Sequence, residues 1–168
     1  MQSLIIKRDI GKTYKKIFAE FTQLLGQLSQ SDWTRPATGT KWTVGEVLTH
    51  LSMQPKNLED LIARLKSGKG RSWLPKLYAD YASYSDVRAA AAKTDLKTIR
   101  KNINRTYQAC LKLLDEIADD EWNKAVRTPR GTFTGRTLFT SFEKEWLVHS
   151  QQIMSALDKK GTSDDVKK

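Results

Sequence analysis

Apolar residues recur along the chain with the spacing of an amphipathic helix. Steps of three and four residues separate apolar positions in four segments, at about 10–28, 44–65, 95–117 and 138–157. The most regular stripe comprises Ile10, Tyr14, Ile17, Phe18, Phe21, Leu24, Leu25 and Leu28. No segment alternates apolar and polar residues as a half-buried strand does, and no internal repeat is present. The pattern therefore predicts an all-α protein built as a four-helix bundle.

The segments between these stripes carry their own signals. Thr43 is followed three residues later by Glu46, which matches a capping box and predicts the start of the second helix. The long connection over residues 67–94 is predicted to contain an additional short helix, and residues 127–135, rich in Thr, Pro and Gly, are predicted to form a loop. We expect a single bundle domain over residues 1–160 and a disordered C-terminal tail over residues 161–168.

Composition narrows the class of protein. A chain of 168 residues is long enough for one domain, and its five Trp, five Tyr and five Phe residues can anchor a core. A single cysteine, Cys110, excludes an intramolecular disulfide and a multi-cysteine zinc module, and its place on an apolar stripe predicts a buried thiol. No stretch approaches the roughly 18 apolar residues that a membrane span needs, and the N-terminal apolar run is too short for a signal peptide. We therefore expect a cytoplasmic protein with no membrane partner.

The formal net charge is +10, from 29 Lys and Arg against 19 Asp and Glu. Such an excess suits a nucleic-acid-binding module, but the basic residues are scattered along the chain and no recognised DNA- or RNA-reading motif is present. Nucleic-acid binding is therefore the less favoured function. The charge can instead attract an anionic cofactor or substrate.

The chain has two histidines, and each falls on the apolar face of its predicted helix. Glu145 precedes His149 by four residues on the same face, and an ionised carboxylate left buried without a partner would cost several kcal/mol. A cation, water in a cavity or a metal could relieve that cost. Glu145 and His149 can chelate one ion from a single helix, and His50 on a facing helix can complete the set. Two imidazoles and a carboxylate suit Zn²⁺, and also Ni, Fe or Mn²⁺. From spacing alone, two alternatives to a metal site remain: His50 as a core histidine, and Glu145 with His149 as a surface charge contact.

Two segments resemble the DinB/YfiT-like superfamily. Its helix-start signature is matched in segment 28–51 by Trp42, Thr43, Val44, Glu46, Val47, Leu48, His50 and Leu51. The segment FEKEWLVHSQQI, residues 142–153, resembles the metal motif of its last helix, with Glu145 where most members have histidine. With Glu145 at this position, the chain resembles the branch of the superfamily that contains the N-terminal domain of mycothiol-dependent maleylpyruvate isomerase. The resemblance covers residues 10–157.

The resemblance implies a fold and a chemistry. It implies a DinB-like bundle with up-up-down-down helix directions, often dimeric, whose divalent metal, zinc foremost, is held by His50, Glu145 and His149. The implied activity is that of an S-transferase or isomerase that uses mycothiol, bacillithiol or glutathione. The metal would ionise the thiol, and the thiolate would attack a small electrophilic substrate. We expect this substrate to be anionic. The second domain of the isomerase has no counterpart in a chain that ends at Lys168, so maleylpyruvate is not the expected substrate. A metal-binding bundle without catalysis, acting as a dimeric scaffold or sensor, is the alternative.

Several further residues are candidates for the pocket. Trp146 is next to Glu145 in the sequence and could floor the site, with a plain core role as the alternative. Gln152, three residues after His149, could orient that imidazole. Tyr81, with its neighbours Tyr78 and Tyr84, could line the pocket from the long connection. Arg136, with Arg127 and Arg130, could recognise a carboxylate or phosphate, unless that loop is simply solvated.

Overall fold

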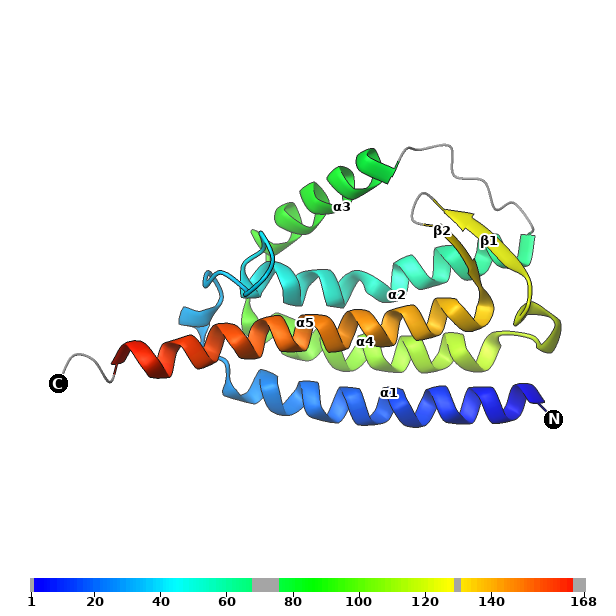
Figure 1. The fold of residues 1–168 in the computed structure, drawn as a ribbon, viewed down its shortest axis with the longest axis horizontal. Coiled ribbons are helices and arrows are strands. Elements are labelled where there is room, and N and C mark those ends of the chain that lie inside the picture. Colours follow the sequence, from blue (N-terminus) through cyan, green and yellow to red (C-terminus); the bar gives the residue numbers. More distant parts are fainter. Residues whose placement is uncertain (1, 68–75, 129–130, 165–168) are drawn as a thin grey trace.

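The computed structural model describes residues 2–67, 76–128 and 131–164, and their side chains except at residues 2–4, 76–83 and 159–164. Four long helices are present: α1 (Gln2–Gln27), α2 (Val44–Ser67), α4 (Leu96–Glu116) and α5 (Gly135–Asp164). They form the expected four-helix bundle (Figure 1). The additional helix predicted in the long connection is α3 (Lys76–Ala91). Helix α5 extends past residue 161, where the tail was predicted to begin, and residues 165–168 lie outside the described chain.

The directions of the four helices differ from the up-up-down-down order implied by the resemblance. Helices α1 and α5 run one way along the bundle, and α2 and α4 run the other way (Figure 1). Contacts between helices agree, because Lys7 near the start of α1 reaches Asp115 at the end of α4, whereas Arg100 near the start of α4 reaches Leu25 near the end of α1. The order is therefore up-down-down-up. Its cause is α3, which returns the chain along the bundle so that α4 starts at the same end as α2.

Each long helix contacts two others in the bundle. Helix α1 packs against α4 and α5, and α2 packs against the same two helices, so α1 and α2 face each other across the core. The largest fully buried side chains are Phe21, Phe139, Leu48, Leu51, Leu58, Leu65, Ile99, Ile103, Leu114, Ile117, Leu138 and Ile153. Cys110 is also buried in this core, 4% exposed, as predicted, and burial raises the pKa of its thiol to about 12. Within the described residues, every helix is too short or too polar to cross a bilayer.

A small β-hairpin stands where a loop was predicted. Strands β1 (Ala125–Thr128) and β2 (Gly131–Thr134) pair antiparallel, with Val126 opposite Phe133. Val126 is fully buried, which anchors the hairpin on the bundle, and Gly131 has a φ of 133° that only glycine adopts readily. The protein is thus a helical bundle with one added hairpin, and this hairpin lies over the end of α2 (Figure 1).

Candidate metal centre

The start of α2 is fixed by the predicted capping box. The Thr43 hydroxyl accepts a hydrogen bond of 3.2 Å from the Glu46 amide, and the Glu46 carboxylate accepts one of 2.8 Å from the Thr43 amide. His50 lies one turn further on and is 9% exposed. Facing it, α5 presents Glu145 and His149 one turn apart. Two antiparallel helices therefore bring the three predicted ligand residues together.

The ligand atoms of these three residues converge. Glu145 Oε2 is 3.4 Å from His50 Nε2 and 3.2 Å from His149 Nε2, and all three ligand atoms lie within 4.8 Å of one another. A tetrahedral ion with bonds of about 2.0–2.1 Å holds its ligand atoms about 3.3 Å apart, so these distances fit a single metal ion. Within the part of the chain that the structure describes, this is the one group of three such residues close enough to share an ion.

The apolar residues around Glu145 in the sequence predicted a buried carboxylate, but the structure shows a half-exposed one. Its side chain is 50% exposed, whereas those of His50 and His149 are 11% and 10% exposed. Polar contacts with the His149 imidazole, and then with the His50 imidazole, lower the pKa of Glu145 well below its ordinary value. The site therefore offers an ionised carboxylate that is open to solvent on one side and flanked by two buried imidazoles on the other.

Gln152 fixes the orientation of one ligand. Its Oε1 lies 2.8 Å from His149 Nδ1, and this is the contact expected of a residue that orients a metal-binding imidazole. A proton held on Nδ1 by this acceptor leaves the lone pair of Nε2 available to a metal on the side of Glu145. The donor set and its support thus fit a divalent ion.

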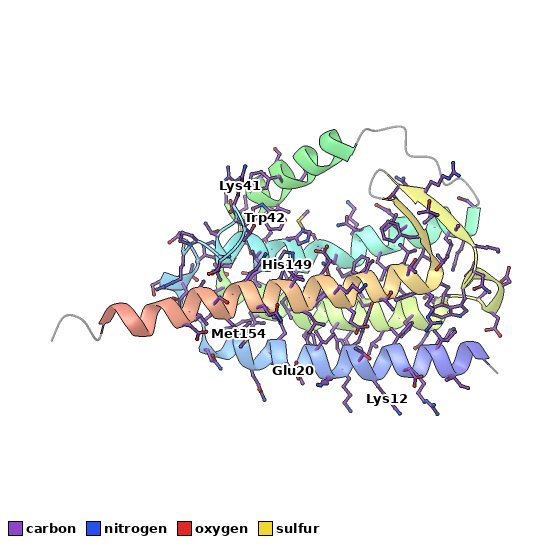
Figure 2. All side chains as sticks on the ribbon, viewed as in Figure 1. Lys12, Glu20, Lys41, Trp42, His149 and Met154 are labelled. Atoms are coloured by element: carbon purple, nitrogen blue, oxygen red, sulfur yellow. The ribbon has the colours of Figure 1, made fainter. Side chains whose placement is uncertain are left out.

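Aromatic side chains cover the imidazoles from the side of α3. The Trp42 ring centroid lies 4.8 Å from that of His50 and 5.9 Å from that of His149. Trp42 and His149 are labelled in Figure 2. Tyr84 stacks on Trp42, and the Arg88 guanidinium lies 4.5 Å from the Tyr84 centroid. Sequence analysis placed Trp42 in the helix-start signature and did not foresee its contact with both histidines.

A cavity of about 360 Å³ opens beside the site, between α2, α5 and the hairpin. Its lining comprises His50, Gln54, Asn57, Asp60, Leu61, Arg64, Thr128, Phe133, Leu138, Ser141, Phe142 and Glu145. Two of the three predicted ligands therefore face it. Sequence reasoning missed the α2 residues of this wall, although Gln54, Leu61 and Arg64 follow His50 at helical spacing and so share its face. Phe133 and Thr128 could not be found, because the hairpin itself was not predicted.

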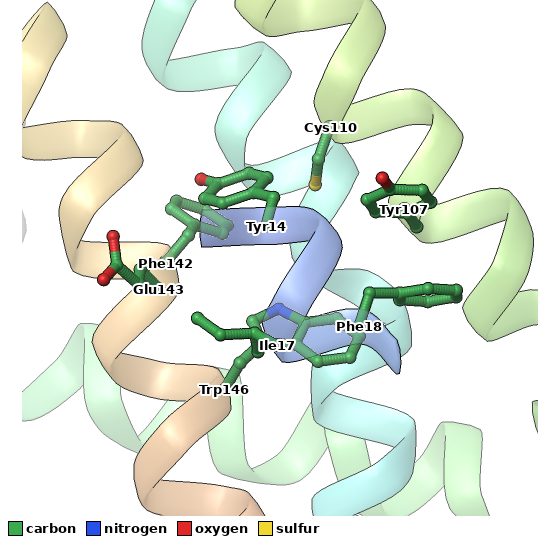
Figure 3. A pocket seen from close by; sticks show the side chains of 8 residues that line it. All are labelled: Tyr14, Ile17, Phe18, Tyr107, Cys110, Phe142, Glu143 and Trp146. Atoms are coloured by element: carbon green, nitrogen blue, oxygen red, sulfur yellow. The ribbon is translucent and has the colours of Figure 1, made fainter. Parts of the chain in front are cut away.

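The other predicted pocket residues lie elsewhere. Trp146 is 7% exposed and packs toward α1 against Phe18 and Phe21, at centroid distances of 6.3 and 4.8 Å. With Cys110 it lines a separate cavity of about 30 Å³ between α1, α4 and α5, room for about one water (Figure 3). The core role is therefore the one observed for Trp146, which does not floor the cavity beside the ligands.

The remaining candidates contribute nothing observable to the cavity. Arg136 and Arg127 are exposed, and neither lines it. Arg130 and the side chains of Tyr78 and Tyr81 lie outside the described residues. Among the described residues, Arg64 is the cation that lines the cavity.

Comparison with known proteins identifies the family and the fold. The profile of the family described as the mycothiol maleylpyruvate isomerase N-terminal domain matches residues 14–154. No curated protein matches the chain.

Solved structures with the same fold include the mycothiol-dependent maleylpyruvate isomerase, with a TM-score of 0.71, 13% identity, and coverage of 88% of this chain and 60% of that one. A variant of that isomerase matches with a TM-score of 0.72, 12% identity and the same coverage. A protein from Streptococcus pneumoniae matches with a TM-score of 0.69 and 12% identity, over 89% of this chain and 88% of that one. The chain thus spans 60% of the length of the isomerase.

Proposed function

The chain belongs to the mycothiol maleylpyruvate isomerase N-terminal domain family, and from this membership we propose that it is a metal-dependent enzyme that acts with a low-molecular-weight thiol. His50, Glu145 and His149 would hold a divalent ion, and the reaction would be an S-transfer or an isomerisation. The observation that carries the proposal is the convergence of the three ligand atoms within 4.8 Å beside a cavity.

Zinc is the metal that this donor set favours, with nickel, iron and manganese as alternatives. Two imidazole nitrogens and one carboxylate oxygen are three protein ligands, the number that catalytic zinc sites use while leaving a position open. When bound, the ion would lower the pKa of a coordinated thiol so that the thiolate predominates at neutral pH. A divalent ion with one carboxylate ligand carries a net charge of about +1, which favours an anionic ligand at the open position.

The protein's own residues support this chemistry. Gln152 holds His149 in the tautomer that presents Nε2, and Glu145 supplies a carboxylate that stays ionised. Trp42 covers the two imidazoles on the side of α3 and so limits the access of water from that side. The open side is the cavity, where His50 and Glu145 form part of the wall that an incoming molecule would meet.

The cavity favours catalysis over a scaffold or sensor role. Its volume of about 360 Å³ falls within the range of roughly 300–1,000 Å³ that is usual for small-molecule pockets. A purely structural metal would need no adjoining space. The family's name makes mycothiol the first thiol to test, with bacillithiol and glutathione as alternatives, and such thiol chemistry fits a reducing, cytoplasmic location.

A homodimer is the assembly that we propose. Helix α5 exposes three large apolar side chains, Leu147, Val148 and Met154, which are 41%, 50% and 51% exposed. An exposed apolar patch is typical of a surface that contacts another protein. A second copy packed on α5 would cover these side chains.

The test is a thiol-transfer assay on the protein loaded with zinc. Mycothiol, bacillithiol and glutathione are each offered with 1-chloro-2,4-dinitrobenzene, and thioether formation is followed in the presence and absence of a chelator. We expect catalysis with at least one thiol, lost on chelation and lost in His149→Ala. Zinc binding without turnover of any thiol would contradict the catalytic proposal and favour the scaffold or sensor.

A further inference from the structure

Two opposite charges lie one turn apart on the α2 wall of the cavity. Asp60 and Arg64 both line the cavity, and both are exposed residues. Residues four apart on a helix are neighbours, with Cβ atoms about 5–6 Å apart. Even so, neither side chain makes an ion pair or a hydrogen bond, with the other or with any residue that the structure describes. Both charged groups are therefore available to a molecule in the cavity.

The charge pair lies at the end of the cavity away from the metal ligands. Asp60 and Arg64 follow His50 by ten and fourteen residues, which is about 15 and 21 Å along the helix axis at about 1.5 Å per residue. Thr128 and Phe133 of the hairpin line this same end, because the hairpin lies over the end of α2 (Figure 1). The cavity is therefore elongated, with the candidate metal centre at one end and a pair of charges at the other.

The span between the two ends is shorter for side chains than for the backbone. Side chains of a helix lean toward its N-terminus. Arg64 on α2 therefore leans toward the metal ligands, and Glu145 on the antiparallel α5 leans toward the hairpin (Figure 1). A ligand that contacts both ends consequently needs a length on the order of 10 Å between its two binding groups.

A carboxylate beside a guanidinium is complementary to an ammonium beside a carboxylate. Arginine binds a carboxylate through two parallel N–H···O bonds, and aspartate accepts hydrogen bonds from an ammonium. A ligand end with only a negative charge would be repelled by Asp60, and one with only a positive charge would be repelled by Arg64. The end of an α-amino acid carries both charges on one carbon. The pair therefore favours a zwitterionic α-amino-acid group.

We propose that Asp60 and Arg64 bind the α-amino-acid end group of a thiol whose sulfur reaches the metal ligands. The inference rests on the proposed thiol-dependent function and names the class of thiol. In a γ-glutamyl thiol such as glutathione, eight bonds separate the sulfur from the α-carboxylate carbon, about 9–10 Å when extended. In cysteine three bonds separate them, too few to reach both ends of the cavity, and the inositol end of mycothiol carries no charge. The site therefore selects γ-glutamyl thiols.

The experiment removes one charge at a time from the ligand and from the protein. Glutathione is compared with 4-aminobutyryl-cysteinylglycine, which lacks the α-carboxylate, and with glutaryl-cysteinylglycine, which lacks the α-ammonium. All three keep the same cysteinylglycine unit, so their sulfur chemistry is equal. Affinities are measured by calorimetry on the zinc-loaded wild-type chain, on Arg64→Gln and on Asp60→Asn. Lys66→Gln and Glu59→Gln are the controls, because they make the same charge changes at exposed α2 positions outside the cavity lining.

We expect wild type to bind glutathione about 3- to 10-fold more tightly than either analogue, between the effect of an exposed ion pair and that of a buried charge-assisted hydrogen bond. Arg64→Gln should remove the preference over the 4-aminobutyryl analogue, and Asp60→Asn should remove the preference over the glutaryl analogue. Both controls should keep the two preferences.

Other results separate two kinds of failure. Equal affinity of wild type for all three thiols, or preferences that survive Arg64→Gln and Asp60→Asn, would overturn the role of the charge pair and leave the proposed function standing. Loss of the preferences in Lys66→Gln or Glu59→Gln would overturn it too, because overall charge would then be the cause. Failure of every thiol to bind zinc-loaded wild type would overturn the inference together with the proposed function.

Discussion

At the scale of single residues, hydrogen bonds determine which atoms of the site are free to bind a metal. The imidazoles of His149 and His50, which contact Glu145, lower its pKa, so it remains a carboxylate throughout the neutral range. Gln152 accepts from Nδ1 of His149 and thereby orients Nε2 toward Glu145. The affinity of the site for metal should therefore depend on Gln152, which is not itself a ligand.

We predict that Gln152→Leu weakens zinc binding by about 10- to 100-fold, the usual effect of removing a partner of a ligating histidine. Gln152→Glu, which keeps an acceptor at the same place, should retain most of the affinity. Competition with a chromophoric chelator measures both. Gln151→Leu, at an exposed neighbour, is the control, and equal zinc affinity in Gln152→Leu and wild type would contradict the assigned role.

The candidate ligands could be predicted because the chain has only two histidines and both fall on apolar stripes next to family motifs. Trp146 was harder to place, since successive residues on a helix point about 100° apart. Glu145 consequently borders the cavity, while its neighbour Trp146 packs toward α1. Asp60 and Arg64 were missed because charged residues on a helix face are ordinary in sequence, and only the cavity distinguishes them.

At the scale of elements, the placement of His50 depends on how the chain enters α2. Gly45, in the first turn of α2, lies against the Trp33 ring, and a Cβ atom at Gly45 would lie 2.4 Å from Cε2 of that ring. The capping box fixes the same turn from the other side. The element therefore has little freedom to shift without moving His50 relative to α5.

Gly45→Ala should lower the free energy of unfolding by about 1–3 kcal/mol, as overpacking of a filled site does. Gly26→Ala is the matched comparison, because no atom lies within 4 Å of a Cβ at Gly26 in α1. There the same change should be stabilising, by up to about 1 kcal/mol, since alanine costs less backbone entropy in a helix. Urea unfolding measures both, and equal effects of the two substitutions would contradict the close contact at Trp33.

The four long helices were predictable from periodicity, because each buries apolar residues at helical spacing. The hairpin was not, since strands of four residues are too short to show an alternating pattern. The spacing of apolar residues also could not predict the directions of the helices. They depend on the path of the chain through α3, which no periodicity records.

At the scale of the whole molecule, charged surface side chains and the candidate metal ligands lie in different parts of the bundle. Charged side chains such as Lys12 and Glu20 point away from the bundle (Figure 2). The three clustered ligand residues instead lie between α2 and α5, where packed helices hold them rigidly beside a cavity. The net charge of +10 is consistent with attraction of the anionic thiol or substrate that we propose.

A calorimetric zinc titration of the full chain, purified without a histidine tag and stripped of metal, tests the metal site most directly. We predict a single zinc site per chain in wild type and in the surface control Lys112→Ala, and its loss in His50→Ala, Glu145→Ala and His149→Ala. Circular dichroism confirms that each variant is folded. Absence of zinc binding in wild type, or a site that survives all three ligand substitutions, would contradict the account.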